Sequence, residues 1–272
     1  MEESAIKSMI KQTFDIVAEG YDNCALRYFA DSARHLVDVL KLSGGERVLD
    51  VATGTGSNAL AIARQLPAGQ VIGVDFSSGM LGQARAKAAQ EDISNVDFIE
   101  MDMQKLSFPD DHFDVASCAF GIFFAEDMAG LLKHIVSKVG KGGRVGIASF
   151  YDSAFQPLAE LFLSRVEQYG IERPSISWKR VSTEEKLEDL LAKANLGKVS
   201  MARKNIGYYL SSAEEWWDVI WYAGFRGLVN QLTPHDLKQF KQAHLDEIQQ
   251  LATTEGIWLD VEVLYAVGIK QQ

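Results

Sequence analysis

Short apolar runs alternate with amphipathic stretches between residues 47 and 150. Runs of this length are typical of buried strands, and the stretches between them repeat with the helical period. The alternation predicts βαβ units, and hence an α/β fold with a mostly parallel sheet covered by helices. The predicted strands are Arg47–Val51, Gln70–Asp75, Val96–Glu100, Phe113–Ala119 and Arg144–Phe150. Helices are predicted near Ser57–Gln65, Ser78–Glu91 and Asp127–Val139, the last closed by a glycine-rich turn at 140–143.

The flanking segments have mainly helical patterns. Apolar residues at helical spacing, from Ile6 to Val17, indicate that the N-terminal segment is helical. After residue 150 we expect helices at Phe155–Tyr169 and Thr183–Ala194, a strand near Val199–Tyr209, two helices in 211–250 and a last strand at Ile257–Ile269. We therefore expect three parts: N-terminal helices (1–40) that close a binding site, a main domain (41–210 and 251–272), and a helical lid inserted at 211–250.

Composition narrows the class of protein. The chain has 272 residues, 47% hydrophobic and 24% charged, as expected of an ordinary globular protein. Its formal net charge of −10 and the lack of a basic run argue against nucleic acid as a partner. The start has no signal-peptide pattern, no apolar stretch is long enough to span a bilayer, and Cys24 and Cys118 are too few for a disulfide framework or a cysteine metal site. We expect a cytoplasmic protein without a metal.

A glycine turn follows the first predicted strand, in the run from Val48 to Gly56. Glycines let a backbone approach a ligand closely, and the start of the next helix offers free N–H groups. The run 54–59 also satisfies the dinucleotide fingerprint G-x-G-x-x-G/A. Asp75, which closes the second strand, suits the ribose of either cofactor. The loop therefore predicts a nucleoside cofactor without selecting one.

Two further acids favour S-adenosylmethionine (SAM) over a nicotinamide cofactor. Asp50, at the mouth of the loop, would repel a pyrophosphate but attract the ammonium and sulfonium charges of SAM. Asp102 follows the third strand, where it can accept from an adenine amino group. In addition, no Tyr has a Lys four residues later, so the usual catalytic pair of short-chain dehydrogenases is absent from the sequence.

Several blocks between residues 14 and about 150 resemble the ubiquinone/menaquinone biosynthesis C-methyltransferase family and the wider class I methyltransferases. These are Phe14-Asp15, Tyr21-Asp22, the 48–56 loop, Gly73-Val74-Asp75 with Met80-Leu81, Leu106 to Pro109 with Phe113-Asp114, Phe120-Gly121, and Gly142-Gly143-Arg144. The resemblance implies a Rossmann-like, seven-stranded sheet whose last strand is antiparallel. It also implies that SAM and the acceptor bind at the carboxyl ends of the strands.

The resemblance also implies roles for individual residues. The glycine loop would hold the methionine part of SAM, Asp75 the ribose, and Asp102 with Met103 the adenine ring. Phe76 and Met80 would pack on the adenine faces, and Tyr21 would close over the methionine carboxylate. The full candidate cofactor site is Tyr21, Asp50, Ala52, Gly54, Thr55, Gly56, Asp75, Phe76, Met80, Asp102, Met103, Ala119 and Phe120.

The resemblance constrains the acceptor less than it constrains the cofactor. The chain departs from the quinone enzymes in the segments expected near the acceptor. Ala119 stands where they have a Ser before Phe120-Gly121, residues 122–124 are apolar where theirs are polar, and the lid is not part of their pattern. The unusual aromatic density of the lid suggests an apolar pocket. Candidate pocket residues are Phe123, Tyr151, Trp217, Trp221, Phe225, Arg226 and His244.

We therefore expect a SAM-dependent methyltransferase that acts on a small, hydrophobic or aromatic acceptor by C- or O-methylation, with S-adenosylhomocysteine (SAH) as its product. Methyl transfer from a sulfonium is an in-line displacement that positioning can accelerate, so no catalytic residue is assigned. A monomer or homodimer is expected. Two alternatives of other classes remain open: a SAM-binding regulator without catalysis, and an NAD-dependent oxidoreductase.

Overall fold

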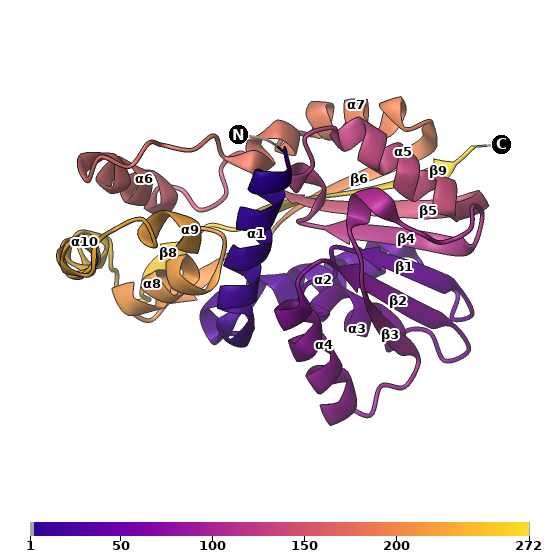
Figure 1. Ribbon diagram of the computed structural model, residues 1–272, viewed down its shortest axis with the longest axis horizontal. Helices are drawn as coiled ribbons and strands as arrows, with labels where there is room; N and C mark the ends of the chain where they lie inside the picture. The colour runs from indigo at the N-terminus through magenta and orange to yellow at the C-terminus, as the bar shows by residue number, and fades with distance from the viewer. Residues whose placement is uncertain (1–2, 272) are drawn as a thin grey trace.

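The computed structural model describes residues 3–271, and a seven-stranded sheet forms their centre (Figure 1). The strand order is β3-β2-β1-β4-β5-β9-β6, and β9 runs antiparallel to both of its neighbours. All other pairings are parallel. This confirms the predicted fold class, including the antiparallel last strand. The strands are β1 (Arg47–Val51), β2 (Gln70–Asp75), β3 (Val96–Glu100), β4 (Phe113–Ala119), β5 (Val139–Phe150), β6 (Leu196–Asn205) and β9 (Glu262–Lys270).

Helices cover both faces of the sheet because alternate side chains of each strand point to opposite faces. Val48 and Val115 belong to a core with α2 (Tyr28–Leu40), α3 (Ser57–Ala63) and α4 (Ser78–Gln90). Leu49 and Ala116 belong to a second core with α5 (Met128–Lys138) and α7 (Glu184–Lys193). The central strands are therefore buried on both faces, which is why they read as continuous apolar runs.

The remaining helices gather beyond one end of the sheet (Figure 1). Helix α10 contacts both α8 and α6, and α9 contacts α8 and α1. Thr233 caps α10 by accepting from the Asp236 N–H at 3.2 Å, and Pro234 follows it at the first helical position, as the sequence predicts. These elements are α1 (Glu3–Val17), α6 (Leu158–Gln168), α8 (Ala213–Tyr222), α9 (Arg226–Val229) and α10 (Pro234–Gln249).

Three predicted strand boundaries differ from those of the structure. Strand β5 begins at Val139, but residues 140–143 pair with neither β4 nor β9, and the regular pairing of β5 starts at Arg144. The last predicted strand is two strands: β8 (Ile257–Leu259) pairs with β7 (Tyr208–Leu210) in a separate ribbon, and β9 follows. The predicted strand near 199–209 is likewise divided between β6 and β7. In the two divided strands the chain changes its pairing partner, because β6 pairs with β9 whereas β7 pairs with β8.

Two features are absent from the part of the chain that the structure describes. Within residues 3–271, no helix is both long enough and apolar enough to cross a membrane. The same residues contain no cluster of His, Cys, Asp and Glu suited to a metal ion.

Candidate functional site

A cavity opens at the carboxyl ends of the strands, where β1 lies between β2 and β4. The chain crosses to opposite sides of β1 at this point, which is the usual ligand position in open α/β sheets. All predicted cofactor residues except Gly56 line this cavity. Its other lining residues are Lys7, Ile10, Phe14, Phe29, Ala33, Thr53, Ser57, Asn58, Met101, Gln104, Gly121, Phe124 and Ala125.

The glycine loop after β1 is shaped by two different requirements. Gly54 and Gly56 both have positive φ angles, of 55° and 82°. A Cβ on Gly56 would lie 3.0 Å from both Ala84 and Phe98, so this glycine allows α3 to pack closely. A Cβ on Gly54 would meet nothing within 4 Å, because that position faces open space, and Gly54 lines the cavity. Gly54 therefore forms a cradle that any side chain would begin to fill.

Gly54→Ala is expected to weaken SAH binding about tenfold, since the added methyl group occupies part of this cradle. The positive φ should cost only about 1 kcal/mol of stability. Calorimetric titration and urea unfolding measure the two effects separately. Gly82→Ala is the matched control, because its Cβ also meets nothing within 4 Å but it lies outside the cavity lining. Equal SAH affinity in both variants would remove Gly54 from the ligand site.

Two residues that end strands at the cavity have strained backbones. Ala52 after β1 and Phe120 after β4 both have φ of 55°, a region that few residues other than glycine adopt. Gly121 makes their approach possible, because a Cβ there would lie 2.5 Å from the Ala52 Cβ. Strain of this kind persists only where the surrounding structure enforces it, and it clusters at functional sites.

Asp75 organises the loops on either side of it. Its carboxylate accepts from the Gly54 N–H at 2.9 Å and from the Ser77 N–H at 2.9 Å. Burial raises the pKa of this carboxyl, and the N–H donors oppose that shift. Each carboxylate oxygen can accept more than one hydrogen bond, so Asp75 retains capacity for ribose hydroxyls.

Asp50 is occupied by the protein itself. Its oxygens accept from Thr53 Oγ1 at 2.6 Å, Asn58 Nδ2 at 2.6 Å and Ser117 Oγ at 2.7 Å. Its exposed fraction is 1%, and burial raises its pKa against the effect of these donors. The carboxylate therefore holds the loop and the start of α3 in place. Asp50 also lines the cavity, so its carboxylate serves this network at the edge of the ligand site.

The same network leaves one acceptor open. Asn58 lines the cavity, and its Oδ1 has no hydrogen-bond partner among the described residues. The amide orientation is fixed, because Nδ2 donates to Asp50 and to Ser117 Oγ at 3.0 Å. Asn58 is not recognisable from the sequence as a cavity residue, since only its position after the glycine turn marks it.

Asp102 has both oxygens partnered. It accepts from the Gln104 N–H at 2.9 Å as the cap of η3 (Met103–Lys105), and from Lys7 Nζ at 3.2 Å. Lys7 is on α1, so this ion pair joins the N-terminal helix to the cavity wall. A second pair, Lys11 with Glu100 at 2.7 Å, joins them beside it.

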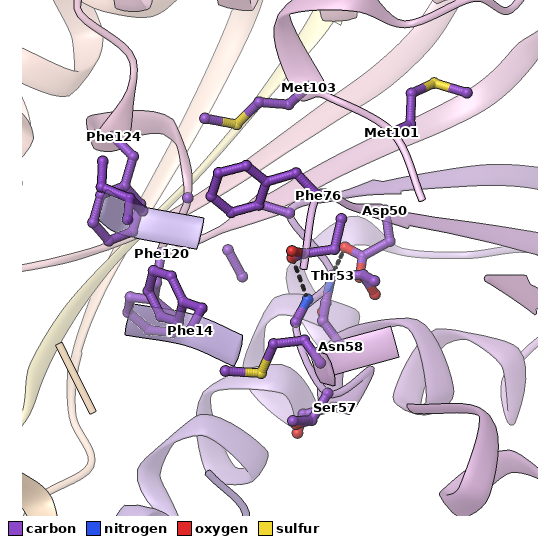
Figure 2. A pocket seen from close by; sticks show the side chains of 18 of the residues that line it. Phe14, Asp50, Thr53, Ser57, Asn58, Phe76, Met101, Met103, Phe120 and Phe124 are labelled. Atoms are coloured by element: carbon purple, nitrogen blue, oxygen red, sulfur yellow. Dashed lines mark hydrogen bonds between the residues drawn. The ribbon is translucent and has the colours of Figure 1, made fainter. Parts of the chain in front are cut away.

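The N-terminal segment closes one end of the cavity with aromatic rings. Tyr21 stacks on Phe29, with ring centroids 4.9 Å apart, and Phe29 contacts Phe120 at 5.5 Å. Phe14 contacts Phe124 at 5.5 Å. We call these five residues the aromatic end. Figure 2 shows Phe14, Phe120 and Phe124 gathered there, apart from Asp50, Thr53 and Asn58.

Tyr21 cannot serve as a base near neutral pH. Burial raises the pKa of its hydroxyl well above the usual range, and the charges of Asp75 and Asp22 add to the shift. The sequence had placed Tyr21 over the cofactor but had not identified Phe14 or Phe29 as cavity residues. Their helical spacing marks an inward face without showing what it meets.

The seven residues predicted for the acceptor pocket do not line this cavity. Phe123 is in the core beneath α5, and Arg203 lies over the ring of Tyr151. The others lie among the lid helices, which pack on α6 and belong to the core that also contains Val48 and Val115. Trp217 stacks on Trp221, Arg226 lies 3.4 Å from the Trp221 ring centre, and Phe225 packs on Phe162 of α6. The aromatic residues of the lid thus fill the interior between the lid helices and α6.

His244 is fully buried in that interior. It accepts from Trp216 Nε1 at 2.9 Å, and its Nδ1 lies 3.4 Å from Glu247, which pairs with Arg165. Burial lowers its pKa to about 4. It is therefore a neutral structural residue and not a group that reaches the acceptor.

Acidification should destabilise the protein through His244. Between pH 6.5 and about 4 the unfolded chain binds a proton at this residue and the folded chain does not. The free energy of unfolding should therefore decrease as the pH is lowered across that window, by up to about 3 kcal/mol. His244→Gln, which still accepts from Trp216, should reduce this pH dependence in urea unfolding. His235→Gln on the surface of the same helix should not, and an equal pH dependence in wild type and His244→Gln would contradict the assignment.

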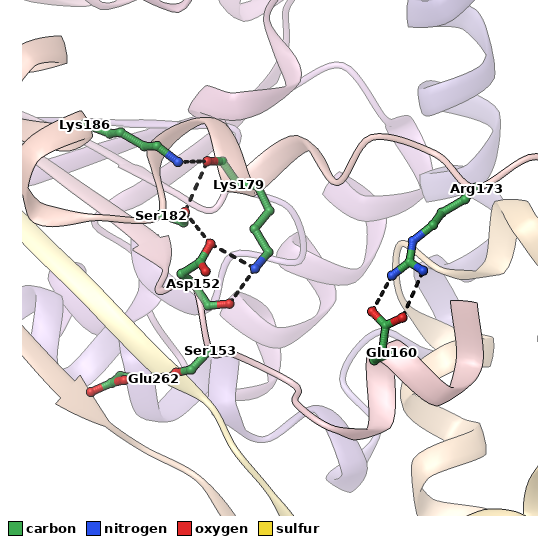
Figure 3. Close-up of polar contacts among 8 residues, drawn as sticks. All are labelled: Asp152, Ser153, Glu160, Arg173, Lys179, Ser182, Lys186 and Glu262. Carbon is green, nitrogen blue, oxygen red and sulfur yellow. Dashed lines mark hydrogen bonds and ion pairs between the residues drawn. The ribbon is translucent and has the colours of Figure 1, made fainter. Parts of the chain in front are cut away.

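Arg180 supports the cavity wall from behind. It donates to the carbonyls of Phe123, Ala125 and Glu126 at 2.5–3.4 Å, so it fixes the loop that carries Phe124. Its neighbour Lys179 donates to Asp152, which also accepts from Ser182 at 3.1 Å (Figure 3). The long connection between α6 and α7 is thereby fastened to the end of β5.

Comparison with known proteins identifies a methyltransferase domain within the chain. Residues 48–143 match the model of a methyltransferase domain. Aklanonic acid methyltransferase DauC of Streptomyces sp. (strain C5) is 29% identical over 66% of this chain and 83% of its own length. The ubiquinone/menaquinone biosynthesis C-methyltransferase UbiE of Geobacter sulfurreducens is 39% identical, but the alignment covers 52% of this chain and 57% of that enzyme.

Among solved structures, the YcgJ protein of Bacillus subtilis has a TM-score of 0.60 at 21% identity, over 89% of this chain and 99% of that one. This likeness concerns the fold. The matched domain is that of a methyltransferase. The antiparallel last strand and the contact between the glycine loop and Asp75 are both features expected of such a domain. Residues 48–143 thus form a methyltransferase domain, and the chain is similar to class I SAM-dependent methyltransferases.

Proposed function

We propose that this protein transfers the methyl group of SAM to a small, largely apolar acceptor that contains an aromatic ring, by C- or O-methylation. The observation that carries the proposal is the aromatic end of the cavity, which lies beside the cofactor residues. Stacked and edge-to-face rings favour a planar apolar partner. The names of DauC and UbiE refer to aklanonic acid and to quinones, which supports an acceptor of this kind.

The polar part of the cavity fits SAM. Gly54 provides a cradle, and Asp75 retains capacity for ribose hydroxyls. Asn58 also lines this part of the cavity, although its unpartnered Oδ1 is itself buried. Phe76, Met80 and Met103 supply apolar surface for the adenine ring. Bound SAM supplies an electrophilic methyl group on a positively charged sulfur.

The contribution of the chain is to position the reactants and exclude water. Of the five residues of the aromatic end, only Tyr21 carries an ionisable group, and its hydroxyl stays protonated. We therefore expect none of these five residues to act as a base toward the acceptor. Alignment of that atom with the methyl carbon at about 3–3.5 Å can supply much of the acceleration.

The proposal is tested with SAM labelled in its methyl group and a panel of hydroquinones, phenols and aromatic carboxylic acids. We expect SAH to form only when an accepted compound is present, with the label in the organic extract. Phe124→Ala should reduce this turnover while SAH affinity stays within about threefold, because truncation of a ring that buries against a ligand is costly. SAH binding without transfer to any compound would favour a SAM-binding regulator.

A further inference from the structure

The segment that carries Tyr21 lies between the lid and the glycine loop. On its outer side, the Tyr222 ring packs against Gly20, where a Cβ would lie 1.9 Å from the nearest ring atom. Asn23 Nδ2 also approaches Asp218 of α8 at 3.5 Å. The lid therefore supports this segment from behind, although the lid residues predicted for the acceptor pocket do not line the cavity.

On its inner side, the segment is fastened by Asp22. Thr55 Oγ1 donates to Asp22 Oδ1 at 2.8 Å, and Lys87 Nζ lies 2.8 Å from Asp22 Oδ2. Lys87 also donates to Thr55 Oγ1 at 3.2 Å, so the three side chains contact one another. They come from the Tyr21 segment, the glycine loop and α4. We call this group the Asp22 latch.

A second acid of the N-terminal segment makes a comparable attachment. Asp15 accepts from Ser77 Oγ at 2.5 Å and from the Gly79 N–H at 3.2 Å, at the start of α4. The acids of the Phe14-Asp15 and Tyr21-Asp22 blocks thus bind the loops after β2 and β1. Those two loops also present Asp75 and Gly54 to the cavity. The aromatic end and the cofactor loops are therefore joined by side-chain contacts.

We propose that Asp22 is a positioning residue that holds Tyr21 closed over the bound cofactor, with Thr55 and Lys87 as its partners. The Asp22 and Lys87 side chains remain 40% and 25% exposed. Ion pairs in such a setting add little to stability, so the latch can open and close at small cost. Neither Asp22 nor Lys87 lines the cavity, and their effect reaches the ligand through Tyr21 and Thr55. The proposal rests on the cavity being the SAM site.

The test is the dissociation rate of SAH, measured by stopped-flow displacement, in wild type, Asp22→Asn, Lys87→Met and the double variant. Each single variant should release SAH about three to ten times faster, with a melting temperature close to that of wild type. The double variant should release it no faster than the faster single variant, because both changes break one interaction. Thr55→Ser, which keeps the hydroxyl, should retain slow release, whereas Thr55→Val should not.

Asp189→Asn is the matched control. It removes the exposed ion pair with Lys193 on α7, whose atoms are 2.6 Å apart, far from the cofactor loops in the sequence. Its release rate should equal that of wild type, and an acceleration equal to that of Asp22→Asn would overturn the proposal. An unchanged rate in Asp22→Asn would overturn it as well. If wild type itself bound no SAH, the assignment of the cavity would fail, which is a distinguishable result.

Discussion

Asp75→Ala should raise the Kd for SAH by a factor of about 10 to 150, equivalent to about 1.5–3 kcal/mol. The variant loses an acceptor for the ribose hydroxyls. It also leaves the Gly54 and Ser77 N–H groups, each held at 2.9 Å by the carboxylate, without that partner. Both losses act on the ligand site, and calorimetric titration with SAH measures their sum.

Asp97→Ala provides the comparison for this prediction. Asp97 is an exposed acid on the neighbouring strand β3 that accepts from Gln70 at 3.0 Å and does not line the cavity. Its affinity for SAH should stay within about twofold of wild type, because surface substitutions away from a site have small effects. If Asp75→Ala bound SAH as tightly as Asp97→Ala, the ribose would not be held at the end of β2.

Asp50→Ala should damage folding as well as binding. The change removes the shared acceptor of three buried donors, Thr53, Asn58 and Ser117. A buried donor left without a partner costs about 1–3 kcal/mol, so we expect the free energy of unfolding to fall by about 3 kcal/mol or more. Urea unfolding without ligand measures this loss. A variant as stable as wild type would show that Asp50 serves the ligand and not the loop.

Two buried serines give a matched pair for the same network. Ser117 on β4 donates to Asp50 at 2.7 Å, whereas Ser149 Oγ on β5 has no partner among the described residues. Ser117→Ala should therefore destabilise the protein by about 1–3 kcal/mol, and Ser149→Ala should be nearly neutral. Equal losses would mean that the volume of the side chain matters more than the network.

The parallel core and the cofactor loop were predictable because their signals are local. A strand buried on both faces must be apolar throughout, and a close backbone approach requires glycine with positive φ, as at Gly54 and Gly56. Asp75 was found because the end of the second strand lies next to the end of the first in such a sheet. These requirements act within a few residues, so the sequence displays them directly.

The packing partners of the lid helices could not be predicted in the same way. Helical spacing shows that Trp217 and Phe225 face inward but does not show against what. Trp216 meets His244, 28 positions later, and Phe14 meets Phe124, which follows β4. Only the tertiary arrangement decides whether an inward face lines a cavity or fills a core. For the same reason, Asn58 and Arg180 were not identified, because their importance lies in partners that are distant in the sequence.

The central claim is that the cavity binds SAM, and the most direct test is calorimetric titration of the wild-type protein with SAH and, separately, with NAD. We expect SAH to bind saturably at one site per chain and NAD to give no saturable heat. The buried carboxylates Asp50 and Asp75 at the strand ends favour a ligand that carries an ammonium group over one that carries a pyrophosphate. Failure to bind SAH, or tighter binding of NAD than of SAH, would contradict the account.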